Sequence, residues 1–246
     1  MASEQQVKVG CCGFRLRQSE YVREFPIVEV QHTFYQPPRV ETLARWRADA
    51  PDDFEFIVKA WMLVTHDAAT PTYRRLKRSL TDEEREGAGS FQDSPIVREA
   101  WAATLEAART LRARRILLQC PARFTPTDEH LDQLQFFITS IAAGTGLEYL
   151  WEPRGGWPDE LVRAVCEDLH LTHVVDPFSA RTVTPERTYF RIHGRRGLLY
   201  EDEELEALLE VLPSAGTSYV LFNNVRMLHD ARRFRVILER AGVPSA

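Results

Sequence analysis

The chain lacks the features that mark several large classes of protein. Its 246 residues contain no apolar run close to the roughly 20 residues that a membrane-spanning helix needs. The opening segment, MASEQQVKVG, has no charged stretch followed by a hydrophobic one, which argues against a signal peptide. We therefore expect a cytoplasmic protein that has no membrane partner.

Cysteine is scarce and is not arranged for metal binding. The four cysteines are Cys11, Cys12, Cys120 and Cys166, and no two of them form a C-x-x-C pair. This spacing argues against a zinc or iron–sulfur site and fits reduced thiols in a cytoplasm. Small apolar packing explains Cys11 and Cys12 better than a role as nucleophile.

Common cofactor and catalytic motifs are also missing. The segment Gly10-Cys11-Cys12-Gly13 does not match the G-x-G-x-x-G fingerprint that follows the first strand of dinucleotide-binding folds. The sequence contains no G-x-S-x-G elbow and no H-x-H or H-E-x-x-H metal motif. We expect no cofactor, with a divalent metal held by dispersed ligands as a secondary alternative.

The charge balance is mildly acidic. Asp and Glu number 36 against 31 Lys and Arg, which gives a net charge of −5. No global field therefore draws the chain to nucleic acid or anionic lipid, although a local basic patch is compatible with this balance. Hydrophobic residues make up 44% of the chain, enough for one sizeable core.

Eight short apolar runs, rich in β-branched or aromatic residues, predict strands. They lie at residues 7–11, 27–31, 54–59, 115–119, 147–151, 172–175, 189–193 and 219–222. Helical patterns lie at residues 41–48, 96–111, 131–142, 158–169, 201–212 and 228–241. The connection 19–25 is short, and the connection 177–188 shows no convincing helix.

This alternation predicts an α/β fold, a (β/α)8 TIM barrel that forms a single domain over residues 1–246. An open doubly wound sheet is the less favoured alternative. The polar stretch 68–93, which contains RRLKRSLTDEEREGAGS, is too long for an ordinary loop. We interpret it as a partly helical insertion over the barrel mouth; a solvated insertion without a role is the alternative.

Polar side chains gather at the carboxyl ends of the predicted strands, where the active sites of such barrels lie. Seven of the eight strands end in an ionisable or amide side chain. These residues are Glu29, Gln31, His32, Lys59, Gln119, Glu152, Arg154, Asp176, Arg191, His193, Arg195, Asn223 and Asn224, with Thr65 and His66 just beyond the third strand. Each has a structural explanation, such as a paired strand residue for Glu29 or a turn for Asp176. Their coincidence favours a site.

The residue types limit the chemistry of that site. Glu29, Glu152 and Asp176 are candidate bases or metal ligands, as are the histidines. The cations Lys59, Arg154, Arg191, Arg195 and Arg196 suit a carboxylate or phosphate substrate. The segment from His193 to Gly197, HGRRG, is similar to an anion-binding loop. Aromatic residues that are candidates for the pocket wall are Phe14, Phe34, Tyr35, Trp61, Trp151, Trp157 and Phe178.

Six segments carry a resemblance to a known family. They are VEVQHTFYQPPRVETLARW, FEFIVKAWMLVTH, ILLQCPARFTP, WEPRGGW, YFRIHGR and YVLFNNV. In this order the chain resembles the domain of unknown function 72 (YecE-like) family over nearly its whole length. The resemblance implies a TIM barrel and supplies no established reaction. The residues of this chain that match the family's motif positions are Glu29, Thr33, Phe34, Tyr35, Lys59, His66, Glu152, Arg154, Arg191, His193 and Asn223.

The chain departs from the family pattern in places. Gly10-Cys11-Cys12-Gly13-Phe14 replaces a Trp-containing opening, and Gln31 stands where the family often has Asn. The segment WEPRGGW lacks the usual His-Pro pair, and Val225-Arg226 replaces a glycine-containing turn after FNN. These differences indicate a divergent branch and affect the expected substrate more than the expected fold.

The leading hypothesis is an enzyme, a lyase, isomerase or hydrolase, that acts on a small phosphorylated or carboxylated substrate derived from a sugar or nucleotide. Glu29, Lys59, Glu152 and His193 are the catalytic candidates. The substrate-binding candidates are Tyr35, His66, Arg154, Asp176, Arg191 and Asn223. A metal held by Glu152, Asp176 and His193 is the secondary version. The alternatives are a nucleic-acid-binding protein, based on the arginines of 74–78 and 195–196, and a non-catalytic scaffold; the oligomeric state is open.

Overall fold

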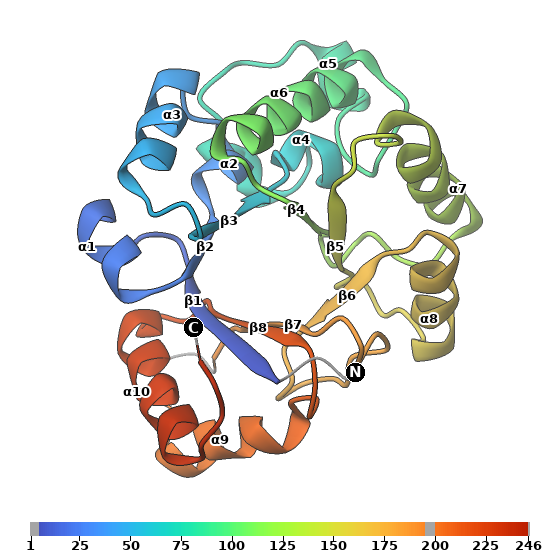
Figure 1. Cartoon of the computed structure of the whole chain (residues 1–246). Coiled ribbons are helices and arrows are strands. Elements are labelled where there is room, and N and C mark those ends of the chain that lie inside the picture. Colours follow the sequence, from blue (N-terminus) through green and yellow to red (C-terminus); the bar gives the residue numbers. More distant parts are fainter. Residues whose placement is uncertain (1–4, 195–199, 246) are drawn as a thin grey trace. The chain divides into compact units, whose positions relative to one another are not determined.

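The computed structural model describes residues 5–194 and 200–245, in which eight parallel strands close into a barrel in the order β1 to β8 (Figure 1). The strands are β1 (Gln6–Cys12), β2 (Ile27–Val30), β3 (Glu55–Lys59), β4 (Arg115–Gln119), β5 (Glu148–Glu152), β6 (Thr172–Val175), β7 (Tyr189–Ile192) and β8 (Thr217–Phe222). All eight coincide with the predicted runs, so the predicted TIM-barrel fold is confirmed.

Helices separate most of the strands. The α-helices are α1 (Gln18–Glu24), α2 (His32–Tyr35), α3 (Val40–Asp49), α4 (Met62–Thr65), α5 (Asp82–Glu86), α6 (Pro95–Leu111), α7 (Asp128–Phe136), α8 (Asp159–Asp168), α9 (Asp202–Ala207) and α10 (Met227–Arg240). The 3-10 turns η1 (Pro71–Arg75) and η3 (Leu208–Val211) and the π-helical turn η2 (Phe137–Ile141) complete the set. The described segment 177–188 contains no helix, as predicted. The connection 19–25, predicted only to be short, is largely the helix α1.

The chain divides into two compact units. Unit 1 comprises Met1–Glu29, Asp49–Glu55 and Thr172–Ala246, and unit 2 comprises Val30–Ala48 and Phe56–Leu171. Strands β2 and β3 each contribute residues to both units. The expectation that residues 1–246 form one domain stays a prediction.

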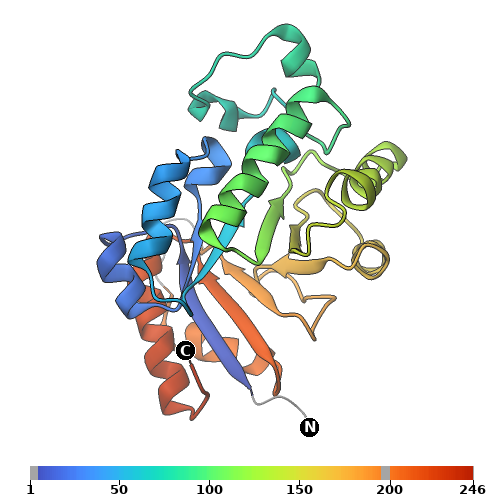
Figure 2. The ribbon, with the colours of Figure 1, turned by 45° about the horizontal axis from the view of Figure 1, so that its top comes forward.

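In unit 1 the strand β1 lies between β2 and β8. In the pairing of β1 with β2, Gly10 is opposite Ile27, and in the pairing of β1 with β8 it is opposite Leu221. A Cβ on Gly10 would lie 2.3 Å from the Ile27 carbonyl oxygen, so only glycine allows β1 and β2 to approach this closely. Helix α10 packs along β1 (Figure 2). Its buried Phe234 contacts the ring of Phe222.

In unit 2 the strands β3, β4 and β5 pair in parallel, so their carboxyl ends lie at the same edge. Lys59 is opposite Leu117, and Gln119 is opposite Glu152. Helix α6 begins where the sequence predicts, because Ser94 Oγ accepts from the Val97 amide and a proline follows at the first helical position. These registers place the polar residue at the end of each strand, Lys59, Gln119 and Glu152, at the same edge of the sheet.

The predicted insertion 68–93 is partly helical, as expected. It contains η1 and α5, and α5 begins with a capping box between Thr81 and Glu84. The segment returns to α4 through hydrogen bonds from Gly89 N to Leu63 O and from Phe91 N to Val64 O. Figure 2 shows it beyond one end of α6. It is thus a structured part of unit 2.

The described helices are too short or too polar to cross a membrane, so no membrane-spanning helix is found within residues 5–194 and 200–245.

Candidate functional site

The carboxyl ends of β3, β4 and β5 bring together a group of side chains that we call the Lys59 cluster. Its members are Phe34, Lys59, His66, Gln119, Glu152 and Arg154. Lys59 is only 4% exposed, and its Nζ donates to Gln119 Oε1 at 2.7 Å. The same Nζ lies 3.8 Å from the centroid of the Phe34 ring, a cation–π distance. The Lys59 ammonium is therefore held among protein groups and does not extend into bulk water.

The main chain around this lysine is fixed by Thr33. Thr33 Oγ1 lies within hydrogen-bond distance of two carbonyl oxygens, 2.8 Å from Val30 O and 2.7 Å from Lys59 O. Thr33 is fully buried, so the hydroxyl satisfies groups that water cannot reach. The first turn of α2 is thus attached to the end of β3, and this places Phe34 against the lysine.

His66 follows α4 and is 4% exposed. Burial, and then the charges of Lys59 and Arg154, lower the pKa of His66 to about 3, so the imidazole is neutral at physiological pH. Its Nδ1 is 2.7 Å from Thr65 Oγ1, and its Nε2 makes no hydrogen bond to the described residues. In the tautomer in which Thr65 donates to Nδ1, the ring N–H of Nε2 is available to a ligand.

Arg154 is the second cation of the cluster, and Glu152 is its carboxylate. Arg154 Nε and Nη2 donate to Glu152 Oε1 at 2.9 and 2.7 Å. The side chain of Glu152 is 6% exposed and that of Arg154 is 38% exposed. One edge of the arginine therefore binds the carboxylate, while part of the guanidinium reaches solvent and can approach a ligand.

The Lys59 cluster has the composition of an anion-binding site that can also carry out proton transfer. Lys59 and Arg154 are cations whose charges both act on the neutral donor His66, so a ligand of negative charge is favoured. Glu152 is the cluster's candidate general base. His66 is a poor base, because its lowered pKa means that it does not accept a proton near pH 7.

In unit 1 the polar residues Glu29 and Arg191 form a closed ion pair. Arg191 Nε donates to Glu29 Oε2 at 2.9 Å and Nη2 donates to Oε1 at 2.8 Å, and both side chains are 0% exposed. Tyr189 Oη also donates to Glu29 Oε2, at 3.2 Å. Because both partners are bound and inaccessible, the pair does not favour the predicted roles of Glu29 as base and of Arg191 as anion ligand.

The thiols beside this pair are equally unreactive. Burial, and then the charge of Glu29, raise the pKa of Cys12 well above its usual range. Burial raises the pKa of Cys11 to about 12. Both residues therefore remain protonated, which agrees with packing roles for them.

Asp176, His193 and Asn223 form a third group, also in unit 1. Asp176 Oδ1 accepts from Phe178 N at 3.1 Å, and Oδ2 accepts from His193 N at 3.0 Å. Asn223 Nδ2 lies 3.2 Å from His193 Nδ1, within hydrogen-bond distance. Asp176 thus has the turn role that the sequence offered as the alternative, and Asn223 orients the half-buried His193.

Two sequence expectations find no support from these positions. Among the described residues, no group of three or more His, Cys, Asp or Glu side chains is placed to hold a metal ion. The set Glu152, Asp176 and His193, whose members belong to different units, stays a prediction. Arg195 and Arg196, proposed as anion ligands, lie outside the described residues.

Sequence reasoning left some contributors out of the proposed site. Gln119, which holds Lys59, was visible as a strand end, and Phe34 was visible within the HTFY segment. The fully buried Tyr189 was not singled out, because a tyrosine that begins a strand looks like ordinary core. Only the folded chain shows which carboxylate its hydroxyl reaches.

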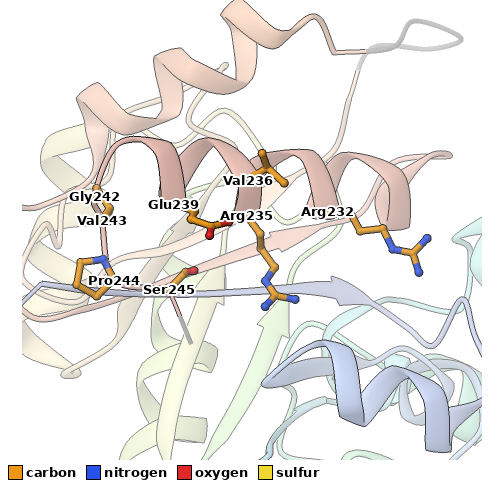
Figure 3. Close-up of a pocket in the computed structure, with 8 residues that line it drawn as sticks. All are labelled: Arg232, Arg235, Val236, Glu239, Gly242, Val243, Pro244 and Ser245. Atoms are coloured by element: carbon orange, nitrogen blue, oxygen red, sulfur yellow. The ribbon is translucent and has the colours of Figure 1, made fainter.

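A large cavity lies away from these groups. Its volume is about 600 Å³, and it lies between α10 and the segment that follows it (Figure 3). Its lining residues are Arg232, Arg235, Val236, Glu239, Gly242, Val243, Pro244 and Ser245. Ser245 forms a bridge to Val7 near the start of β1, so the cavity lies at the amino end of that strand. Active sites of such barrels lie at the opposite end.

Comparison with known proteins agrees with the segments quoted above. A family model described as "Protein of unknown function DUF72" matches residues 13–245. The UPF0759 protein YecE of Escherichia coli K12 is 42% identical over 50 residues, which are 20% of this chain and 18% of YecE. The aligned part is therefore under a fifth of this curated relative.

Solved structures share the barrel at low identity. A DUF72 family protein from Enterococcus faecalis V583 has a TM-score of 0.72 at 20% identity, over 95% of each chain. One from Thermotoga maritima MSB8 has a TM-score of 0.69 at 22% identity, over 95% of this chain and 99% of that one. More distant barrels include endonuclease IV from Thermus thermophilus, with a TM-score of 0.52 at 13% identity over 96% and 99% of the two chains. At identities this low, the similarity shows only that these proteins share the fold.

Proposed function

Because the chain belongs to the DUF72 family of proteins of unknown function, its activity has to be inferred from its own side chains, and we propose that it is an enzyme for a small anionic substrate. The Lys59 cluster binds the phosphate or carboxylate group of that substrate. One observation carries the proposal: the buried Lys59 and the partly exposed Arg154 come together with the buried His66, which its burial, and then these two charges, keep neutral.

Each member of the cluster has a role in this proposal. Lys59 and Arg154 contribute charge, and His66 Nε2–H adds a neutral donor whose strength benefits from the dry surroundings. Gln119 and Phe34 position the lysine and are not themselves reactive. Glu152 removes a proton from the bound substrate, which fits a lyase, isomerase or hydrolase.

The experiment is a melting-shift screen with phosphorylated sugars, nucleotides, carboxylates and the corresponding neutral sugars. A ligand present at 100 times its Kd adds about 2.7 kcal/mol to the free energy of unfolding. We expect anionic compounds to raise the melting temperature and their neutral counterparts to leave it unchanged. Lys59→Met and His66→Gln should remove the shift.

Lys77→Met is the matched control for this screen. Lys77 is exposed and makes no ion pair among the described residues, so its loss removes the same charge without touching the Lys59 cluster. A shift that persists in Lys59→Met, or an equal shift with neutral sugars, contradicts the anion site.

Turnover separates an enzyme from a binding protein. Each compound that raises the melting temperature is incubated with the protein and followed by NMR for a product. We expect Glu152→Gln to bind the compound without converting it. A ligand that binds the unmodified protein and is never converted favours the non-catalytic scaffold, and a ligand that is a polynucleotide favours the nucleic-acid hypothesis.

A cytoplasmic location is the second part of the proposal. All four cysteines are free and buried, which suits a reducing compartment. The measurement is the distribution of the protein between cell fractions, and recovery from an oxidising compartment would contradict this part.

A further inference from the structure

The turn η1 places the guanidinium of an arginine over an aromatic ring next to the Lys59 cluster. Arg75 Cζ lies 4.4 Å from the centroid of the Tyr35 ring. Arg75 is exposed and has no carboxylate partner among the described residues. The hydroxyl of the half-buried Tyr35 likewise makes no hydrogen bond to them. The polar edges of both side chains are therefore available to a ligand.

A chain of contacts connects this stacked pair to the proposed site. The rings of Tyr35 and Phe34 are 5.0 Å apart, and the ring of Phe34 contacts both His66, at 5.0 Å, and Lys59. A second connection runs through η1 itself, because Tyr73 Oη donates to the His66 carbonyl at 2.7 Å. The turn that carries Arg75 is thus attached to the backbone of a residue of the Lys59 cluster.

The contact with the Tyr35 ring prepares the arginine for an anion. The ring accepts no hydrogen bond from the edge of the guanidinium, so the N–H groups of that edge stay free to match the two oxygens of a phosphate or carboxylate. An exposed arginine without such a contact loses rotamer freedom when it binds, and the stack has already removed part of that freedom.

The neighbouring cations show that this arrangement is specific to Arg75. Arg74 is exposed and has no aromatic or acidic partner among the described residues. Arg78 donates to Glu99 at 2.6 Å and is also paired with Glu84, so it holds the segment together. Three cations of one basic run therefore differ in their surroundings, and only Arg75 of these three is oriented by a ring.

We propose that Arg75, oriented by Tyr35, binds a second anionic group of the substrate, so that the substrate class is a bis-anionic metabolite such as a sugar bisphosphate. This rests on the proposed function, in which Lys59 and Arg154 bind the first anionic group. The insertion 68–93 then has a role in specificity, through the arginine of its first turn.

Calorimetric titration with matched pairs of sugar monophosphates and bisphosphates, of three to six carbons, tests the proposal. We expect at least one bisphosphate to bind about ten-fold more tightly than its monophosphate, as one additional charge-assisted contact allows. Arg75→Met and Tyr35→Leu should remove the preference while the monophosphate still binds. Tyr35→Phe keeps the ring and should keep the preference, whereas Arg75→Lys keeps the charge but not the planar fork and should lose most of it.

Arg74→Met is the matched control, since it removes the same charge one residue away and should leave the preference intact. Equal affinities for every pair, or a preference that survives Arg75→Met, overturn the role of Arg75 alone. If no member of the panel binds the unmodified protein, the role of Arg75 in a sugar bisphosphate site is overturned, whereas the proposed function fails only if the nucleotides and carboxylates of the melting-shift screen give no shift either. Tight binding of a single-stranded oligonucleotide that Arg74→Met and Arg75→Met weaken equally also overturns the proposal, because a general electrostatic surface would then explain the cations.

Discussion

The Glu29–Arg191 pair of unit 1 and the Lys59 cluster of unit 2 both place charges at strand ends, yet they differ in access. In the pair, both side chains are 0% exposed, and the two ions bind each other through two hydrogen bonds. In the Lys59 cluster, Arg154 is 38% exposed, and His66 keeps one ring nitrogen without a hydrogen bond to the described residues. Residues of the same chemical type therefore stabilise the fold in one place and are available to a ligand in the other.

The largest expected effect is the loss of stability in Glu29→Gln. The change removes the charge partner of Arg191 and leaves a buried guanidinium without it, which costs roughly 3–5 kcal/mol. Urea denaturation measures this loss. Glu148→Gln is the control: Glu148 pairs with Arg115 but is 55% exposed, so its loss should cost less than about 1 kcal/mol. If Glu29→Gln is as mild as the control and abolishes ligand binding, the pair belongs to the site and the comparison is wrong.

The second effect is a pH dependence that arises from His66. Its folded pKa of about 3 lies below the unfolded value near 6.5, so between these values the unfolded chain binds more protons than the folded one. The free energy of unfolding therefore falls as the pH drops through this window, by about 2 kcal/mol between pH 7.5 and pH 5 from this residue alone.

Urea denaturation of the unmodified protein and of His66→Gln at these two pH values measures that contribution. In His66→Gln, the free energy of unfolding should differ less between pH 7.5 and pH 5 than it does in the unmodified protein, whatever the effect of the substitution on stability at pH 7.5. An unchanged difference would show that His66 is accessible and titrates normally, and the cluster would then lack the neutral donor.

The smallest expected effect concerns Asp176. Asp176→Asn replaces one of the two oxygens that accept backbone amides with an NH₂ group, so one amide loses its acceptor, at a cost of about 1 kcal/mol. Urea denaturation measures this loss, and the melting-shift screen should give unchanged ligand shifts. Loss of the ligand shift at unchanged stability would instead place Asp176 in the substrate site.

The amount that was predictable from the sequence differs between fold and site. Arg115–Gln119 and Thr172–Val175 are strands with the predicted bounds, because apolar β-branched runs ended by polar residues define parallel strands locally. The π-helical turn at Phe137–Ile141 interrupts a pattern that predicts continuous helix. Phe137, its first residue, packs against Trp101, a contact between residues distant in sequence that no local pattern indicates.

The site was predictable as a set of positions and not as a set of roles. Glu29 and Glu152 both end predicted strands and both were assigned as candidate bases. The structure gives Glu29 a fully buried arginine and Glu152 a partly exposed one. Exposure depends on what packs around a side chain, and no local pattern in the sequence encodes it.

By itself, then, the sequence determined the eight strands, the order of the barrel and the polar residues at the strand ends, because these follow from short-range hydrophobic patterning and parallel connection. Tertiary structure alone decided that Glu29 and Arg191 pair with each other, that burial together with Lys59 and Arg154 keeps His66 neutral, and that Arg75 lies over the Tyr35 ring. The physical reason is that charge pairing and desolvation depend on distances between residues that the chain brings together only when it folds.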